Sequence, residues 1–509
     1  MRRPATHDPV TTIDRSEVGR ASVHRRSAAP ALIAAPVLIG LLAAAVAGWN
    51  VLVPGIWRDE AASITAAQRD WAAFAGLVAH IDAVHALYYA LLHLWFDAVG
   101  YSPLSFRLPS VVAAGIGAAL VTVLGTRLAG RRAGLASGLV AAVLPTLVWA
   151  GGEGRSYAWT AALATGATLA LLHALGPHGS RRRWATAWIG YSALLALGTV
   201  LFVDALLLAA AHLVAVLLIG GRKRLEGGIA ITAAVAAASP LAVLALRQSG
   251  QVAWISRYSA PTGWELPAQQ WFRSDAVAIG AASVLTAGVI AWVVRRRVPR
   301  RALAVALPWA LLPPLVLVAI GLVHAPVYWP RYVTFTAPAV ALLVGVAAAS
   351  LPRLLTAIAV AVVAALAVPQ IAADRAPDAK FDPGIRAGAA LLGRERSAAD
   401  GPAGILYAAY LDVPHATTRL DAIAYPAAFR GLEDLRAVVP LDRSTELFGT
   451  DRSLAAAASR AGDLRTVWVL LSTPTSPTVE APVAQLEALG LRQTARFTTA
   501  DTVLLRFSR

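Results

Sequence analysis

The chain has 509 residues, of which 57% are apolar and only 15% charged, and its mean hydropathy is +0.61. This composition excludes a single soluble core and is typical of a protein with many membrane spans of about 20 apolar residues. The net charge of +16 does not indicate a nucleic-acid partner, because the basic residues form short clusters between apolar runs, and the absence of cysteine excludes disulfides and thiolate metal sites.

Residues 1–27 are polar and basic, and they predict a disordered cytoplasmic tail, with a cleaved signal peptide as the alternative. Arginine clusters between the later apolar runs are typical of cytoplasmic loops, and placing every cluster inside predicts about 11 spans with the C-terminus outside. The apolar runs lie at 28–54, 108–128, 134–150, 157–176, 184–200, 202–220, 226–246, 275–294, 302–323, 332–350 and 353–370.

A further run at 84–99 is also apolar, but a span there conflicts with the charges. It would place the arginine clusters at 131–132 and 181–183 outside the membrane. We therefore expect an interfacial or re-entrant helix in the first outer loop, which suits the Tyr, His, Trp and Asp residues interleaved with its leucines.

The composition changes at about residue 371, where charged residues, proline and glycine return. Strands are expected at 404–410 and 466–471, a strand or hairpin at 497–507, and helices at 384–396 and 483–489. These elements predict a small soluble α/β domain over 371–509, on the outer side of the membrane.

Polar side chains collect at the outer ends of the predicted spans. Acidic residues are costly near hydrocarbon and outer loops are normally poor in arginine, so both kinds of residue point to a functional site. Carboxylates suit proton transfer, and guanidinium groups match the geometry of a phosphate. The candidates are Asp59, Glu60, Asp82, His85 and Tyr88 in the first loop, Glu153, Arg155 and Tyr157 in the second, Arg247 in the third, and Arg331 and Tyr332 in the last.

Most of these candidates also have a structural explanation, and it is their collection on one side of the membrane that favours a site. The alternatives are a solvated turn at 58–60, a helix cap at Asp82, a Glu153–Arg155 pair, interfacial anchors at 331–332 and a snorkelling Arg107.

Six stretches, in their order and spacing, resemble the lipid-phosphosugar-dependent glycosyltransferases of the GT-C type, specifically the bacterial family 39 and protein-O-mannosyltransferase-like group. They are 57–60, 82–89, 91–95, 107–110, 153–158 and Arg331-Tyr332. The resemblance covers about residues 30–350. One departure is that many relatives have proline after the histidine at the position of His85, where this chain has Ala86.

The resemblance implies an α-helical polytopic membrane protein with the GT-C fold. Interfacial helices are expected in the first outer loop and a small α/β domain at the C-terminus. The chain then divides into a tail at 1–27, a transmembrane catalytic domain at 28–370 and an extracytoplasmic domain at 371–509.

The implied reaction is the inverting transfer of a sugar, mannose in the first instance, from a polyprenyl-phosphate donor. The acceptor is a hydroxyl of a protein, lipid or glycan at the outer face of the membrane. Asp59 is the expected general base, and Glu60 or Asp82 orients the acceptor or shares the proton. Arg155 and Arg331 are expected to hold the departing phosphate, with Arg247 as a weaker candidate. The other expected substrate-binding residues are His85, Tyr88, Glu153, Tyr157 and Tyr332.

Several alternatives stay open at this point. The expected reaction needs no cofactor, but a divalent cation held by Asp59, Glu60, Asp82 and His85 is an alternative. The sugar can instead be arabinofuranose or another pentose added to a cell-wall glycan. A lipid or sugar transporter would also carry polar residues at membrane depth, but it would show repeats and broken helices near the midplane. A catalytically inactive scaffold is the last alternative.

Overall fold

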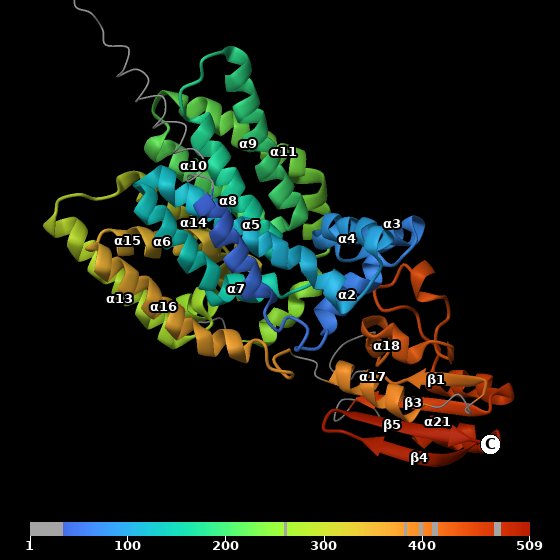
Figure 1. The fold of residues 1–509 in the computed structure, drawn as a ribbon. Coiled ribbons are helices and arrows are strands. Elements are labelled where there is room, and N and C mark those ends of the chain that lie inside the picture. The colour runs from blue at the N-terminus through green and yellow to red at the C-terminus, as the bar shows by residue number, and fades with distance from the viewer. Residues whose placement is uncertain (1–33, 259–261, 381–383, 397–400, 410–415, 473–479) are drawn as a thin grey trace, which may run out of the picture.

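The computed structural model describes residues 34–258, 262–380, 384–396, 401–409, 416–472 and 480–509. Long helices form one part of the molecule and a five-stranded sheet forms the other, with short helices between them (Figure 1). The tail predicted at 1–27 lies outside the described residues.

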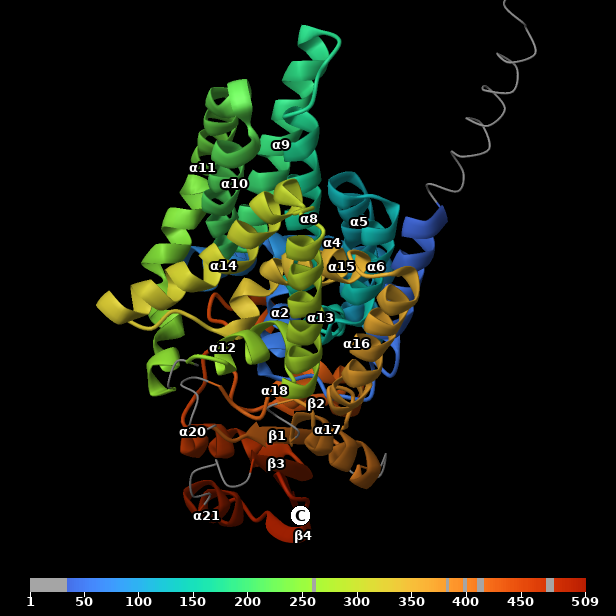
Figure 2. The ribbon, with the colours of Figure 1, turned by 90° about the vertical axis from the view of Figure 1, so that its left-hand side faces the viewer.

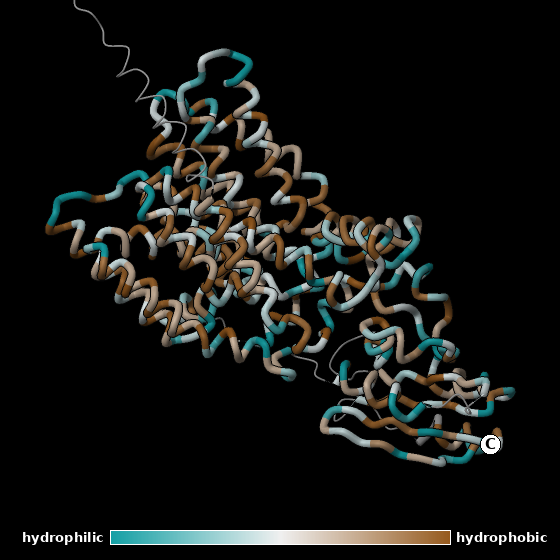
Figure 3. The backbone as a smooth tube through the Cα atoms, viewed as in Figure 1, coloured by the Kyte–Doolittle hydropathy of each residue, from teal (hydrophilic) through white to brown (hydrophobic). Residues whose placement is uncertain are grey.

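Each apolar run predicted from the sequence contains at least one helix in the part that the structure describes. The helices are Ala34–Gly48, α5 (Pro103–Ala129), α6 (Arg131–Val143), α7 (Pro145–Gly151), α8 (Tyr157–Ala174), α9 (Arg181–Leu201), α10 (Leu207–Ile219), α11 (Arg224–Arg247), α13 (Asp275–Val294), α14 (Arg300–Val323), η6 (Pro330–Thr336) continued by α15 (Ala337–Ala349), and α16 (Arg353–Ala373). Hydrophobic residues dominate these helices, and hydrophilic residues gather in the loops at their ends (Figure 3).

Seven of the described helices are long and apolar enough to cross a membrane, and α6 with α7 makes an eighth if this pair, bent by 59°, is one span. The bend follows from Pro145, because Leu144 before it is extended at ψ 118° and proline cannot continue the hydrogen bonds of a helix. The chain is therefore a multi-pass membrane protein. The count is lower than the predicted 11 or so spans, in part because Ala34–Gly48 and Val203–Ile219 are shorter apolar helices.

Helix α15 lies at the centre of the long helices (Figure 2). In the segment Pro330–Ala349, which joins η6 and α15, 83% of the most apolar 18 residues are buried. Small residues allow this packing: a Cβ added to Gly345 would lie 2.3 Å from the backbone of Ser137 on α6. Close approach through glycine, alanine and serine is the usual way in which helices pack inside a membrane.

The first loop after Ala34–Gly48 holds the short helices α2 (Arg58–Ala67), α3 (Trp71–His80), η1 (Ala83–His85) and α4 (Ala86–Val99). They lie between the long helices and the sheet (Figure 1). Because α4 has 14 residues, it is about 21 Å long and too short to cross a bilayer. This agrees with the expectation that the run at 84–99 is not a span.

The C-terminal sheet has the strand order β2-β1-β3-β5-β4. Strands β2 (Leu432–Asp434), β1 (Ala403–Tyr407) and β3 (Thr466–Ser472) are parallel, and the hairpin of β4 (Arg492–Thr498) and β5 (Thr502–Ser508) is antiparallel to β3. Leu391 and Leu392 of α17 (Gly384–Glu395) pack on one face of the sheet, while α20 (Leu454–Ala458) and α21 (Glu480–Ala488) cover the other. The predicted fold class is confirmed, but the three-residue strand β2 was not predicted, and the strand or hairpin expected at 497–507 includes only the last two residues of β4.

Candidate active site

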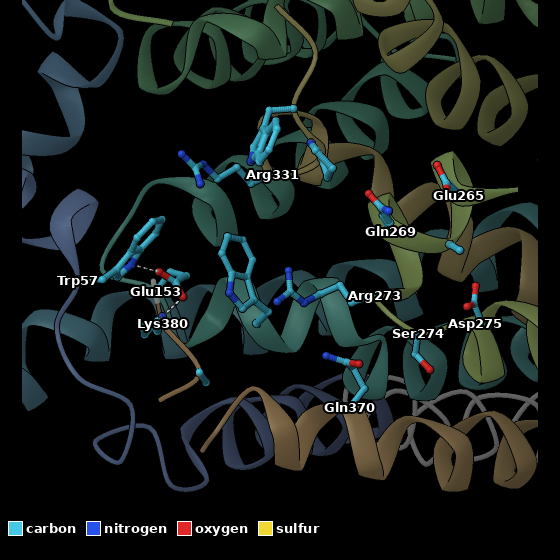
Figure 4. Close-up of a pocket in the computed structure, with 15 residues that line it drawn as sticks. Trp57, Glu153, Glu265, Gln269, Arg273, Ser274, Asp275, Arg331, Gln370 and Lys380 are labelled. Atoms are coloured by element: carbon cyan, nitrogen blue, oxygen red, sulfur yellow. Dashed lines mark hydrogen bonds and ion pairs between the residues drawn. The ribbon is translucent and has the colours of Figure 1, made fainter. Parts of the chain in front are cut away.

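A cavity of about 550 Å³ opens where Trp57 before α2, α7 and the turn after it, residues 265–275, the start of η6 and the segment at the end of α16 meet. Figure 4 shows charged and aromatic side chains from these distant parts of the sequence pointing toward one another. Its lining includes Trp57, Trp149, Glu153, Arg273, Arg331 and Lys380.

Asp59 lies beside this cavity because its carboxylate contacts the cavity residue Arg331, at 3.0 Å. It stands in the first turn of α2, where the helix dipole favours a negative charge. The Asp59 side chain is 25% exposed, so a substrate hydroxyl can reach it. Arg331 is held from its faces by Trp57 and Trp254, whose ring centroids lie 5.2 and 5.5 Å from the guanidinium carbon.

Glu60 points away from that pair, into the interior. It forms two bonds to Arg107, of 2.9 and 2.6 Å, and accepts a third from the Gly154 amide at 2.8 Å. Burial raises the pKa of Glu60, but the positive charges of Arg107 and Lys380 and these hydrogen bonds bring its pKa below the ordinary value. These contacts favour an ionised carboxylate with a structural role, and the expected role of Glu60 in orienting the acceptor or sharing the proton stays a prediction.

Arg107 does not snorkel to the membrane surface, as one alternative expected. It is 1% exposed, and besides Glu60 it donates to the carbonyls of Val51, Pro54 and Gly55. The Glu60–Arg107 pair thus fixes the chain that leads into α2.

Arg155 connects the turn before α8 to the first loop. One terminal nitrogen donates to the Asp59 carbonyl at 2.9 Å and to the hydroxyls of Ser63 and Tyr89 at 3.0 Å, and the other contacts His85 Nε2 at 2.6 Å. These contacts occupy the Arg155 side chain within the protein. They differ from the expectation that Arg155 holds a phosphate, because the guanidinium already positions α2 and η1.

His85 is buried and receives a hydrogen bond from Arg155, so its Nδ1 carries the ring proton. Burial first, and then the charges of Arg155 and Arg331, hold the pKa of His85 well below its usual range. The imidazole is therefore neutral at physiological pH. Because His85 is neutral, it adds no further positive charge next to Arg155 and Arg331.

This neutral state predicts a dependence of stability on pH. The unfolded chain binds a proton at His85 as the pH falls through about 6.5, whereas the folded chain does not, so folding loses up to about 1.4 kcal/mol per pH unit below that value. His85→Gln keeps an acceptor for Arg155 but does not titrate. The free energy of unfolding, measured from pH 7 to pH 5, should therefore fall less steeply in this variant. Equal slopes in the two proteins would contradict a neutral His85.

Asp82 does not cap a helix, although the sequence suggested it. Its backbone is left-handed (φ 61°, ψ 23°), and its side chain accepts a hydrogen bond of 2.7 Å from the Tyr89 hydroxyl instead. Burial raises the pKa of Asp82, more than the charge of Arg155 lowers it. Such a strained backbone at a polar, buried residue is common at functional sites. The neighbouring Ala83 amide is held by Gln248, at 2.8 Å.

Glu153 is buried and does not pair with Arg155. It accepts a hydrogen bond of 2.8 Å from the Trp57 indole and forms an ion pair with Lys380, which follows the last long helix (Figure 4). Glu153 of the second loop, paired with Lys380 of the segment that leads to the sheet, thereby holds Trp57, which lies two residues before Asp59.

Two of the three candidate tyrosines, Tyr157 and Tyr332, pack in one aromatic cluster next to the cavity residue Trp149. Tyr157 stacks on the cavity residue Trp149 at 5.7 Å, and Phe202 contacts both Tyr157 and Tyr332 at ring distances of 5.6 and 5.9 Å. Tyr88 is 2% exposed. Tyr88 and Tyr157 are therefore packed inside the protein, whereas the expectation was direct contact with a substrate.

Arg247 is exposed at the end of α11 and does not line the cavity in the part of the chain that the structure describes. Arg273, which was not among the candidates, does line the cavity. Arg273 lies over Trp149 at 4.8 Å and pairs with Asp374 at 3.1 Å. The sequence signal was the same for both arginines, since both lie in the predicted third outer loop, but Arg273 was overlooked.

No three His, Asp or Glu side chains of the described residues come together as a metal-ligand group. The oxygen-rich set considered from the sequence is not assembled, because Asp59 and Glu60 face different arginines.

The architecture is that of the GT-C glycosyltransferases, which confirms, for the fold, the resemblance drawn from the motifs. ArnT from Cupriavidus metallidurans is similar in its apo crystal structure, with a TM-score of 0.58, 13% identity, and coverage of 94% of this chain and 98% of that chain. ArnT bound to undecaprenyl phosphate is similar with a TM-score of 0.57, 14% identity, and coverage of 92% and 97%. The apo oligosaccharyltransferase of Archaeoglobus fulgidus is similar with a TM-score of 0.49 and 11% identity. The match covers 86% of this chain and 69% of that chain. No family model matches the sequence, and no curated protein sequence matches it.

Proposed function

We propose that the protein is an inverting glycosyltransferase that moves a sugar from a polyprenyl-phosphate donor to an acceptor hydroxyl at the extracytoplasmic face of the membrane. The observation that carries this proposal is the Asp59–Arg331 pair, with 3.0 Å between the two side chains, beside a cavity that also holds Arg273 and Lys380. A base next to a set of cations is what attack on a phosphate-activated sugar needs. The similarity of the fold to ArnT bound to undecaprenyl phosphate supports a polyprenyl-phosphate donor.

The reaction follows from these positions. The lipid phosphate of the donor takes Arg331 and Arg273 as partners, which releases the Asp59 carboxylate from its ion pair. Asp59 then removes the proton of the acceptor hydroxyl while the acceptor oxygen bonds to the anomeric carbon. The bond between that carbon and the phosphate oxygen breaks, and the phosphate leaves with the electron pair, stabilised by the two guanidinium groups. Attack from the face opposite the leaving group inverts the anomeric centre.

The distribution of the charges supports an assignment of the two sides of the membrane. The arginine clusters lie in the α5–α6, α8–α9, α10–α11 and α13–α14 loops, mostly at the end of the long helices away from the sheet (Figures 1 and 3). Cytoplasmic loops are enriched in arginine, which supports an extracytoplasmic position for the cavity and for residues 371–509.

The test is sugar transfer by the purified protein in liposomes, with polyprenyl-phosphate mannose and polyprenyl-phosphate arabinose supplied in separate reactions. Transfer of mannose is the expected result, on the motif resemblance, and transfer of arabinose alone would correct the sugar but keep the reaction class. If neither lipid is consumed with any offered protein, lipid or glycan acceptor, the donor or the acceptor is a different one, and a transporter becomes the favoured alternative.

Arg331→Gln should raise the KM for the donor by about 10- to 100-fold, since a hydrogen bond to a charged phosphate contributes about 1.5–3 kcal/mol. Arg247→Gln is the matched control, because Arg247 is exposed and lies outside the cavity lining. Initial rates at varied donor concentration measure both. Equal KM values for the two variants would remove Arg331 from the phosphate site.

A further inference from the structure

Residues of the C-terminal α/β domain contact the chain at both ends of helix α2, which carries Asp59. Before the helix, the Ile56 amide donates a hydrogen bond of 2.9 Å to the Tyr425 hydroxyl. Arg386 of α17 donates to the Val53 carbonyl in the same stretch. Both partners come from the domain near the sheet, more than 300 residues further along the chain.

The second contact lies just after α2, at Arg69. This side chain is 1% exposed, and it donates to the carbonyls of Ser444, Glu446 and Leu447 at 2.8, 2.6 and 3.0 Å. The amide of the next residue, Asp70, donates to another carbonyl of the same loop, at 3.1 Å. Four backbone groups of residues 441–449 are thus fixed by the turn between α2 and α3.

Apolar packing accompanies these hydrogen bonds. Leu447 and Phe448 pack against the same core as Ile64 and Leu77, which belong to α2 and α3. A buried guanidinium that binds three carbonyls specifies one position of a loop, since any shift leaves charged donors unpaired in the interior. Helix α2 is therefore held between two fixed points of the α/β domain.

We propose that the α/β domain is a positioning element of the catalytic site, which holds α2 so that the Asp59 carboxylate stays beside Arg331. The inference rests on the proposed function, in which Asp59 is the base. Arg69 is the principal positioning residue, because a displacement of about 1 Å at a catalytic group is enough to cost about 100-fold in rate.

The fold offers a direct way to test this, because the chain has no cysteine. A Cβ added to Gly76 of α3 would lie 3.4 Å from the Cβ of Thr445 in the loop at 441–449. This is close to the separation of about 3.5–4.5 Å that a disulfide needs. Gly76→Cys with Thr445→Cys can therefore lock the loop onto the first-loop helices, and a reductant can release it.

Arg69→Met is expected to lower kcat by about 10- to 100-fold while the donor KM changes less than about twofold. The amides of residues 58–67 should also exchange hydrogen faster, by about tenfold or more. Oxidation of Arg69→Met combined with the two cysteines should recover most of the kcat and the slow exchange, and a reductant should abolish the recovery. Arg443→Met is the matched control, since this arginine of the same loop is exposed and should leave both readouts unchanged.

Three results would overturn the proposal: unchanged hydrogen exchange in Arg69→Met, unchanged kcat in that variant, or loss of activity when the cysteine pair alone is oxidised. The last would mean that the domain must move away during turnover. Hydrogen exchange requires no substrate, so it tests the positioning of α2 even if the protein transfers neither sugar. Tyr425→Phe provides a milder variant, with a smaller effect in the same direction, should Arg69→Met fail to fold.

Discussion

Asp59→Asn is expected to slow sugar transfer by about 10²- to 10⁴-fold, which is the usual contribution of a general base. Asparagine has nearly the same shape and keeps an oxygen for the Arg331 guanidinium, at 3.0 Å in the native protein. It cannot accept the proton of the acceptor hydroxyl at neutral pH. Initial rates in liposomes with the active donor measure the loss, and a thermal unfolding curve establishes that the variant is folded.

Asp97→Asn is the matched control, because it also removes a carboxylate from the first loop. Its side chain on α4 is 69% exposed and contacts only His93 among the ion pairs of the described residues. The control should retain the wild-type rate. Full activity in Asp59→Asn would show that Asp59 is not the base, and Asp82 would then be the next candidate.

Glu60→Gln should lower the free energy of unfolding by about 3–5 kcal/mol, because it leaves Arg107 as an unpaired buried charge. Both side chains are almost completely buried, at 0% and 1% exposure. The pKa of Glu60 lies below its ordinary value in the folded protein, so the ion pair is fully formed at neutral pH. Chemical unfolding in detergent, followed by tryptophan fluorescence, measures the loss.

The double variant Glu60→Gln with Arg107→Met measures the coupling energy between these two side chains. It removes the unpaired charge, so it should be more stable than the sum of the two single changes predicts, with a coupling of about 0.5–3 kcal/mol. A cost below about 1 kcal/mol for Glu60→Gln would contradict the structural role given to this carboxylate.

The fold followed from the sequence because it depends on local patterns. Runs of apolar residues fix the helices. The positions of the arginine clusters indicated that residues 84–99 do not cross the membrane, in agreement with the short helix α4. The buried strands at 403–407 and 466–472 were recognisable from their apolar and β-branched residues. Helix lengths were predicted less well, since a break such as that at Leu144–Pro145 divides one apolar run into two helices.

The site followed from the sequence only in part, because contacts between distant residues have no local signal. Asp59 and Arg331 were both candidates, but nothing in the sequence paired them. Glu60 was grouped with Asp59, yet consecutive residues of a helix point about 100° apart, so one faces the cavity side and the other the interior. Lys380 lies beyond the stretch that resembles the family, and only the fold brings it to Glu153.

The pairing of charges around the cavity has a consequence for how a lipid carrier is exchanged. Its three cations already have carboxylate partners: Arg331 has Asp59, Arg273 has Asp374, and Lys380 has Glu153. In the proposed reaction, a phosphate would enter by replacing a carboxylate and not by neutralising free positive charge, so its affinity should depend only weakly on ionic strength. The spent carrier still bears its phosphate, and the displaced carboxylates compete for the same arginines. In the proposed reaction, this competition should limit product inhibition by the carrier, so that the membrane pool of carrier can keep turning over.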